Sequence, residues 1–552
     1  MKYILITILL LLILPLAATL PPEWRALQRD LGIQAAQYKD TPEHQALRER
    51  TPRHYNVGDT QIFWRWNLSV MPPLWIQTSA TCRAVGEHCY IFVADSEWNV
   101  HMTQGNVDTI LFRLEDSTVN DPTQGAIEMD IGLFGPIPDE LDNDPRLIVF
   151  YSALGSFQGT SFDGYFSPYN QVTEAQAQQM NPPGHSNECE MIYMTCYPLS
   201  PVTPIRLSVL AHELAHLIHW GQDANEETWL NEGCAELAMV VYGIPDPITG
   251  FPSAPDNNLT AWNQTFADYV KVMLFFTYLQ EHYDSTGMIR SLVENPSNGI
   301  VSLIQEIAIH YPNLTFADIF CNWNIANALD RLTPGEGLYN YAQLALPSFT
   351  MTSLNTSPAL NNQTIQPYAA DYLKYNVIQP ASSFSLQSNF PIRVSTLIFD
   401  SPNNCTEVRE EGTGTFFFLD PVAAGAYRVN YVLSNPTSSS ITYSYTSVVS
   451  NDDNVAPVTG TALTGNSPNP FKCSTNISYN LKENLPVRID IFNSRGQKVR
   501  TLVDNNQIAG THSTAWNGKD DNRIPVSAGV YLYRLTAGTY QSIRRMSLLP
   551  TE

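Results

Sequence analysis

A change of hydrophobic periodicity along the chain is the feature that most constrains its fold. Residues 204–330 carry apolar side chains at the spacing of amphipathic helices, beginning with RLSVLAHELAHLIHW and ETWLNEGCAELAMVVYG. On both sides the pattern changes to short alternating runs typical of strands, such as TQIFWRWNLSV, CYIFVADSEW and RLIVFYSAL. A helical block that follows strands predicts a first unit of the α+β class.

Length and turn composition divide the chain further. The 552 residues suggest about three to four domains. After residue 350 the sequence is strand-like, and a linker-like stretch at 451–469 separates one last strand-rich unit. We therefore expect a leader or pro-segment at 19–54, an α+β unit at 55–345, a β-sandwich at 350–450 and an Ig-like β-sandwich at 465–552.

The first eighteen residues predict export. Lys2 precedes an apolar run from Ile4 to Leu14, and small residues follow at Ala17 and Ala18, as in a secretory signal peptide. A membrane anchor is the alternative, but the run is shorter than the ~20 residues that span a bilayer. We expect residues 1–18 to be removed and the protein to be secreted or attached to the cell surface.

The net charge and the cysteines narrow the possible partners and crosslinks. A formal net charge of −23 would repel phosphate backbones, so nucleic-acid binding is not expected. Export permits disulfides, and Cys82/Cys89 and Cys189/Cys196 are each seven residues apart. Neither pair has the CxxC spacing of a zinc ribbon, so we predict two structural disulfides that close small loops.

Residues 212–216 read HELAH, with two histidines four positions apart. On a helix this spacing places His212 and His216 on one face, where both imidazoles can bind the same Zn²⁺. Glu213 then lies beside the metal and can act as a general base toward water. The alternative is a buried helix whose two histidines happen to align, so the interpretation depends on a third ligand.

The third ligand is expected from the next helical segment, WLNEGCAE. Fifteen residues separate His216 from Glu232, enough for a second helix to bring this carboxylate to the same ion. Glu236, one helical turn further on, either accepts a hydrogen bond from a ligand imidazole or is a solvated surface carboxylate. Asp223 and Glu227 are rival third ligands.

His212-Glu-x-x-His216 followed by Trp-Leu-Asn-Glu232-Gly resembles the gluzincin metallopeptidases. The aminopeptidase N family shows the same HELAH followed by WLNEGFA, and the hyicolysin-like secreted peptidases are similar in architecture. This chain has a shorter separation between the second His and the Glu than the aminopeptidases, and it lacks their GAMEN motif. The resemblance implies an endopeptidase on a zincin-like α+β domain, with His212, His216 and Glu232 as zinc ligands, Glu213 as the base and Glu236 beside a ligand.

The segment YVKVMLFFTY, which begins at Tyr269, is similar to the YEKG segment of the aminopeptidase family. There the leading Tyr hydrogen-bonds the oxyanion of the tetrahedral intermediate, and the resemblance assigns this role to Tyr269. The alternative is an aromatic core residue, and Tyr242, His310 and Tyr311 are further candidates. Zinc peptidases also bind peptides along an exposed edge strand, for which we expect Glu190–Met194.

The last unit contains NSPNPF followed by the alternating runs ISYNL, VRIDIFN and VYLYRL, which predict a sandwich of about seven strands. SPNPF, Trp516, Gly518 and Gly529-Val530-Tyr531 resemble the Ig-like domain of the flagellar hook-capping type and the sorting domains of type IX secretion substrates. The resemblance implies contact with secretion or surface-attachment machinery. A plain structural Ig-like module is the alternative.

These patterns together predict a monomeric zinc-dependent endopeptidase with one Zn²⁺ per chain, acting on protein or peptide substrates. Two other functions stay open: a non-catalytic surface adhesin on a peptidase-like scaffold, and a zinc amidase that acts on cell-wall material. The acidic segment at 139–144, DELDND, either binds a structural Ca²⁺ or is simply solvated.

Overall fold

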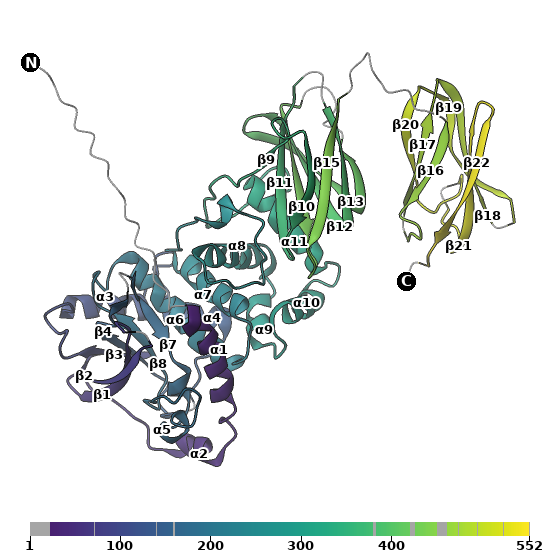
Figure 1. Ribbon diagram of the computed structural model, residues 1–552. Helices are drawn as coiled ribbons and strands as arrows, with labels where there is room; N and C mark the ends of the chain where they lie inside the picture. Colours follow the sequence, from purple (N-terminus) through teal and green to yellow (C-terminus); the bar gives the residue numbers. More distant parts are fainter. Residues whose placement is uncertain are drawn as a thin grey trace, which may run out of the picture.

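The computed structural model contains an α+β unit followed by two β-sandwiches (Figure 1). The multidomain, β-rich organisation agrees with the prediction. The structure describes residues 22–70, 72–139, 141–157, 160–378, 382–419, 426–449, 461–472, 474–493, 495–522 and 524–550. None of the helices in these ranges has the length and hydrophobicity needed to span a bilayer. The signal peptide predicted at 1–18 lies outside the described residues.

A six-stranded mixed sheet is the base of the first unit. Its strand order is β1-β2-β3-β4-β8-β7, with β3, β4 and β8 parallel at the centre. These three strands are buried along their whole length, which explains their continuous apolar sequences. The strands are β1 Thr60–Asn67, β2 Leu74–Val85, β3 Cys89–Ala94, β4 Leu147–Ser152, β7 Gly164–Phe166 and β8 Met191–Thr195.

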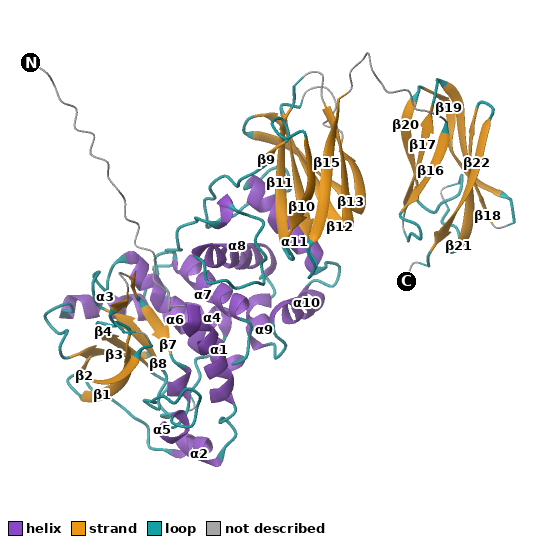
Figure 2. Cartoon of the chain, in the orientation of Figure 1, coloured by secondary structure: helices purple, strands orange, loops and turns teal. Residues whose placement is uncertain are grey.

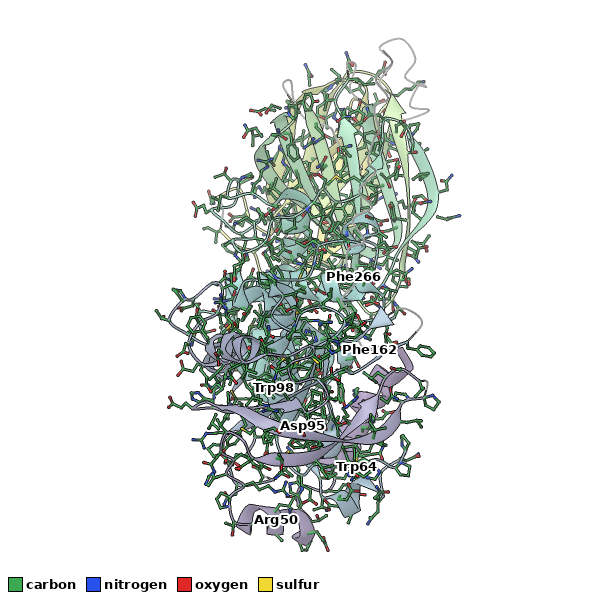
Figure 3. The ribbon with its side chains drawn as sticks, turned by 90° about the vertical axis from the view of Figure 1, so that its left-hand side faces the viewer. Arg50, Trp64, Asp95, Trp98, Phe162 and Phe266 are labelled. Atoms are coloured by element: carbon green, nitrogen blue, oxygen red, sulfur yellow. The ribbon has the colours of Figure 1, made fainter. Side chains whose placement is uncertain are left out.

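Helices fill the space between this sheet and the first sandwich (Figure 2). The side view in Figure 3 places Trp64 and Asp95 beside the strands of the sheet. The two segments quoted above as helical form α6 and α7, and four more helices, α8 to α11, complete the block predicted at 204–330. The longer helices are α1 Pro22–Ala36, α3 Gln104–Glu115, α4 Ala126–Phe134, α6 Pro204–Gln222, α7 Thr228–Tyr242, α8 Phe266–Tyr283, α9 Met288–Glu294, α10 Gly299–His310 and α11 Phe316–Leu329.

Two expectations for residues 55–204 need correction. The region is not only strand-like, because α3 and α4 interrupt it; α3 begins with a capping box between Thr103 and Asn106. Glu190–Met194 is not an exposed edge strand, because β8 pairs with β4 on one side and with β7 on the other. Among the described strands, the end of the sheet on this side is β7.

The predicted disulfides are also wrong, because the seven described cysteines are all free and buried. In the β2–β3 pairing, Cys82 lies opposite Phe92 and not opposite Cys89. Cys189 and Cys196 lie beyond opposite ends of β8, whose residues rise by about 3.3 Å each, so the extended strand keeps their sulfurs apart.

The first sandwich is a single seven-stranded sheet that folds over an apolar core of its own, and part of it also packs into the core of the helical block. It contains β9 Thr352–Ser353, β10 Ala359–Ile365, β11 Ala369–Asn376, β12 Ser382–Ser401, β13 Asn404–Leu419, β14 Arg428–Asn435 and β15 Ile441–Val449. Tyr372 and Val432 belong to the same apolar cluster as the first unit. At this junction the Asn324 side chain donates to Ser434 Oγ (3.1 Å), and Arg393 pairs with Asp318 (2.6 Å). The described strands of this unit, β9 to β15, are therefore docked on the helical block.

The C-terminal unit has a core of its own. Its seven strands form two sheets, β16-β17-β20 and β19-β18-β21-β22, as the alternating runs predicted. The Trp516 ring is fully buried at the centre, and its indole N–H donates to the Lys519 carbonyl (2.9 Å). The strands are β16 Ala462–Ser467, β17 Thr475–Leu481, β18 Leu485–Asn493, β19 Lys498–Gln507, β20 Gly510–Trp516, β21 Gly529–Ala537 and β22 Tyr540–Leu548.

Candidate metal centre

The α6 helix carries the HELAH segment through the interior of the first unit. Thr203 is its N-cap and Pro204 its first residue, where the missing N–H of proline costs no hydrogen bond. Nearly every side chain of α6 is buried, as expected for a helix that is apolar all round. The helical period then places His212 and His216 one turn apart on the same face.

The α7 helix packs against α6 and brings Glu232 to these histidines. A methyl group at Gly233 would lie 2.3 Å from the Phe276 ring of α8, so only glycine permits this contact. The close approach of α7 to α8 therefore explains why the WLNEG segment has a glycine at position 233. Gly243 ends α7 with φ 107°, a conformation that favours glycine.

Three ligand atoms converge between α6 and α7. His212 Nε2 and His216 Nε2 lie 3.1 Å apart, and Glu232 Oε2 lies 3.6 Å and 3.8 Å from them. Zinc bound tetrahedrally at about 2.0–2.1 Å requires ligand atoms roughly 3.3 Å apart. Two imidazoles and one carboxylate are also the donor set of a catalytic zinc site with one open position. These residues therefore fit Zn²⁺.

Glu236 lies on the far side of the His212 ring. Its Oε1 is 3.5 Å from His212 Nδ1, and the residue is 1% exposed. Of the two interpretations drawn from the sequence, the solvated surface carboxylate is wrong for this buried residue. A carboxylate at Nδ1 favours the tautomer whose Nε2 is free to bind a metal.

Glu213 faces a pocket that reaches the three ligands. The edge strand β7 forms one wall, and Gly164 is so close that an added Cβ would lie 3.0 Å from Glu213 Cγ. The leader helix α1 forms a second wall. The residues on this pocket include Arg29, Gly32, Gly164, Tyr165, Phe166, His212, Glu213, His216, Glu232 and Glu236.

The rival ligands have other contacts. Asp223 lines the pocket but accepts the Asn225 N–H (3.3 Å), and the Glu227 carboxylate accepts the Trp229 indole N–H (2.8 Å). Neither belongs to a metal-binding group among the described residues. His219 lies in the core, where burial lowers the pKa of its imidazole to about 3.

The structure does not bring Tyr269 to the pocket. The residue is buried near the start of α8, with its ring 4.9 Å from that of Trp262, and it is not among the described pocket-lining residues. Tyr242, His310 and Tyr311 do not line the pocket in the described part of the chain either. The role of Tyr269 stays a prediction.

The leader contributes more than its polar sequence suggested. Leu31 and Ala35 are fully buried in the core of the first unit. The Arg29 guanidinium donates to the carbonyls of Asn225 (2.9 Å) and Glu226 (2.8 Å), beside the pocket. No motif in the sequence indicated that α1 would form a wall of the site, because this contact joins segments almost two hundred residues apart.

The carboxylate of Glu190 lies beside the acidic segment at 139–144. Asp139, Asp142 and Glu190 place carboxylate oxygens within 4.8 Å of one another. Burial, above all, raises the pKa of Asp142 to about 7, so this group binds a proton readily in the absence of a cation. The calcium site stays a prediction.

Comparisons with known proteins bear on the C-terminal unit. No curated protein matches the chain. PorZ, a bacterial surface component of the type-IX secretion system of Porphyromonas gingivalis, is 13% identical, with 24% of this chain and 15% of PorZ covered and a TM-score of 0.13. A β-glucuronidase of Ruminococcus gnavus is 6% identical, with 34% of this chain and 35% of that chain covered and a TM-score of 0.11.

A β-glucuronidase of Faecalibacterium prausnitzii is 9% identical, with 33% of this chain and 37% of that chain covered and a TM-score of 0.12. The chain spans well under half the length of each of these structures, and TM-scores this low carry no functional argument. The family comparison is more specific: residues 471–541 match the FlgD Ig-like domain. The chain therefore carries, in its C-terminal unit, an Ig-like domain similar to that of FlgD.

Proposed function

We propose that the protein is a secreted or cell-surface zinc endopeptidase. The observation that carries the proposal is the convergence of His212 Nε2, His216 Nε2 and Glu232 Oε2 within 3.8 Å, with Glu213 on the same pocket. A purely structural zinc site is normally closed by four protein ligands. Three ligands next to a pocket and a general base favour hydrolysis.

The chain's own residues have distinct roles in this mechanism. His212, His216 and Glu232 would hold Zn²⁺, which supplies Lewis-acid polarisation and lowers the pKa of water when bound. Glu213 takes a proton from the attacking water and returns it to the leaving amine. Glu236 orients the His212 imidazole through Nδ1.

The edge strand β7 supports a peptide substrate. It pairs with β8 on one side only among the described strands, and its residues Gly164–Phe166 line the pocket. Tyr165 and Phe166 are only 1% and 8% exposed, so an extended peptide would reach this edge from the pocket side, where it could hydrogen-bond to the strand and place its carbonyl beside the metal. This mode of binding suits cleavage within a chain and makes no demand for a free terminus.

The C-terminal Ig-like unit supports a role in export or surface attachment. It has a separate core, so it can fold without the pocket. We assign to it the contact with secretion or attachment machinery, and to residues 1–18 the export signal. The proposed active species is one monomeric chain with one zinc at the His212 centre.

The test compares the wild type with Glu213→Gln in zinc content and in casein cleavage. We expect about one zinc at the His212 centre in both proteins and a loss of activity of about 10²–10⁴-fold in the variant. Glu128→Gln is a matched control, because Glu128 lies in the first turn of α4 and is exposed.

Zinc-loaded wild-type protein that cleaves neither proteins nor peptides would overturn the proposal. If this protein instead hydrolyses amides of cell-wall material, the site is a zinc amidase. Binding to surfaces without any hydrolysis, unchanged in Glu213→Gln, would identify an adhesin.

A further inference from the structure

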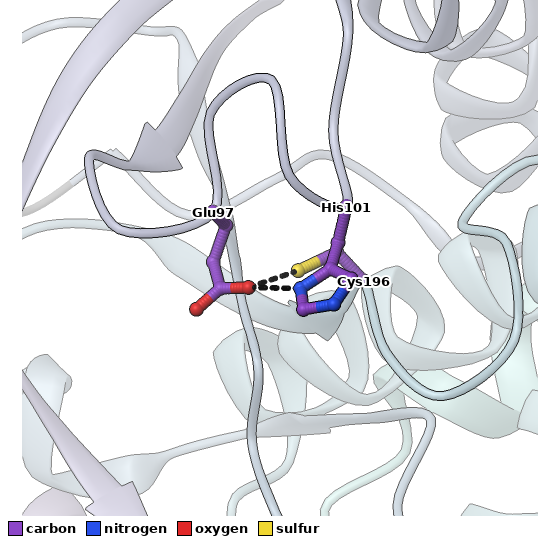
Figure 4. Close-up of side chains that lie close together, drawn as sticks. All are labelled: Glu97, His101 and Cys196. Atoms are coloured by element: carbon purple, nitrogen blue, oxygen red, sulfur yellow. Dashed lines mark hydrogen bonds and ion pairs between the residues drawn. The ribbon is translucent and has the colours of Figure 1, made fainter.

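A second cluster of metal-ligating side chains lies outside the candidate metal centre, beside the end of β8 (Figure 4). His101 Nδ1 and Cys196 Sγ approach the same oxygen of Glu97, Oε2, at 2.6 Å and 3.7 Å. Each residue offers one ligand atom, and these atoms all lie within 4.8 Å of one another. We propose that Glu97, His101 and Cys196 form a second metal site, for a thiophilic divalent ion such as Zn²⁺.

Two rigid elements hold these ligands. The Glu97 carbonyl accepts the N–H groups of Val100, His101 and Met102 at 3.0–3.1 Å, which closes residues 97–102 into a tight loop. The Cys196 N–H donates to the Ser152 carbonyl (3.1 Å), so the end of β8 is bonded to the end of β4. The backbone that carries the ligands is therefore fixed before any ion arrives, which lowers the ordering cost of binding.

Neighbouring groups orient the ligands. Ser96 Oγ donates to Glu97 Oε1 (3.0 Å), which leaves Oε2 as the oxygen that faces the histidine and the cysteine. The His101 ring packs against Tyr197, with ring centroids 4.6 Å apart. Supporting contacts of this kind tune metal ligands in known sites.

Burial and charge suit a divalent cation. Cys196 is 2% exposed, whereas about a third of the His101 side chain reaches solvent, which leaves room for entry and for a water as fourth ligand. A bound ion replaces the thiol proton, and one thiolate with one carboxylate then neutralises its charge of two.

The donor set distinguishes this cluster from the acidic one at Asp139, Asp142 and Glu190. A soft thiolate and an imidazole select zinc-like ions, whereas oxygen-only groups select calcium or magnesium. Binding requires a small rearrangement. His101 and Glu97 are in direct hydrogen-bond contact, and the partly exposed His101 side chain must retreat by roughly 0.7 Å to reach tetrahedral spacing.

The test replaces zinc by Co²⁺ in the purified protein and records its absorption spectrum. Thiolate ligation gives a near-ultraviolet charge-transfer band, and a site made of His212, His216 and Glu232 contains no sulfur. We expect this band and two metal ions per chain in the wild type. Cys196→Ser should lose the band and one of the two metal ions. His101→Gln keeps the Cys196 thiol and should only weaken metal binding at this second site.

Two controls separate this proposal from the proposed peptidase function. Cys405→Ser removes another buried thiol, one whose Sγ contacts the Glu407 carbonyl (3.5 Å), and should keep the band. His216→Ala should lose the other ion and the peptidase activity but keep the band. A wild type with no band, a band that survives Cys196→Ser, or a mass spectrum that shows Cys196 in a disulfide would overturn the second site.

Discussion

The two clusters, at His212 and at Glu97, contain three ligands each but are assembled in different ways. The first lies within 21 residues of sequence, on two consecutive helices, and its spacing can be recognised directly. The second joins a loop to a strand end almost one hundred residues away. The difference teaches that a helical site can be predicted from local spacing, whereas a site at the end of a sheet depends on strand order.

The surroundings of the clusters differ as well. The first opens on a pocket that Glu213 and the edge strand β7 also line, the arrangement that the proposed reaction requires. The second has a buried thiol and a tight loop, and its histidine is the most exposed of the three ligands. On our proposals the first cluster carries hydrolysis, whereas the second binds an ion between the loop at 97–102 and the end of β8.

Glu232→Ala should have the largest effect. It removes one of three ligands, so we expect loss of zinc from the first cluster and loss of all measurable peptidase activity. Asp223→Ala, which changes another pocket carboxylate, should keep the zinc. Zinc analysis and casein cleavage measure both results.

The opposite pattern for these two variants would move the third ligand to Asp223. Loss of the cobalt–thiolate band in Glu232→Ala would break the comparison in a different way, because it would mean that the two clusters do not bind metal independently.

Glu236→Gln should have an intermediate effect. Loss of the carboxylate at His212 Nδ1 should weaken zinc binding by about 10–100-fold, as for other partners of metal ligands. Competition with a chelator measures this affinity. Glu226→Gln is the control, because this buried pocket carboxylate accepts the Gly299 N–H (2.7 Å) instead; equal losses in both variants would remove any special role of Glu236.

Gly164→Ala should have the smallest effect of the three. Its new methyl group would meet Met194 Sδ at 2.9 Å and Glu213 Cγ at 3.0 Å. Overpacking of this kind destabilises a fold by about 1–3 kcal/mol. Because the new methyl group also displaces Glu213, we expect in addition roughly a tenfold loss of activity, equivalent to about 1.4 kcal/mol of activation free energy, with zinc retained. Gly132→Ala, where a Cβ meets nothing within 4 Å, should leave activity unchanged.

Full activity in Gly164→Ala would show that hydrolysis does not require the close contact between the β7 backbone and the Glu213 side chain. In that case the edge strand would not position the substrate, and the first cluster would depend on its helices alone.

Much of the first cluster could be predicted because helices are local. His212 and His216 are four residues apart, and the short connection to Glu232 leaves α7 little choice except to pack beside α6. The sheet was harder. Glu190–Met194 was correctly expected to be a strand, but its apolar sequence did not reveal that β7 would pair along its other side. The disulfides failed for the same reason, because equal spacing along a chain says nothing about strand register.

By itself, the sequence determined the helical block, the ligand spacing of HELAH and Glu232, and the C-terminal Ig-like sandwich. Tertiary structure alone decided that β7 is the edge, that α1 forms a wall of the pocket, and that Glu97, His101 and Cys196 meet. The physical reason is the sequence distance over which each interaction acts. Helical periodicity and strand alternation act over a few residues, whereas strand order and docking depend on which distant apolar surfaces exclude water together.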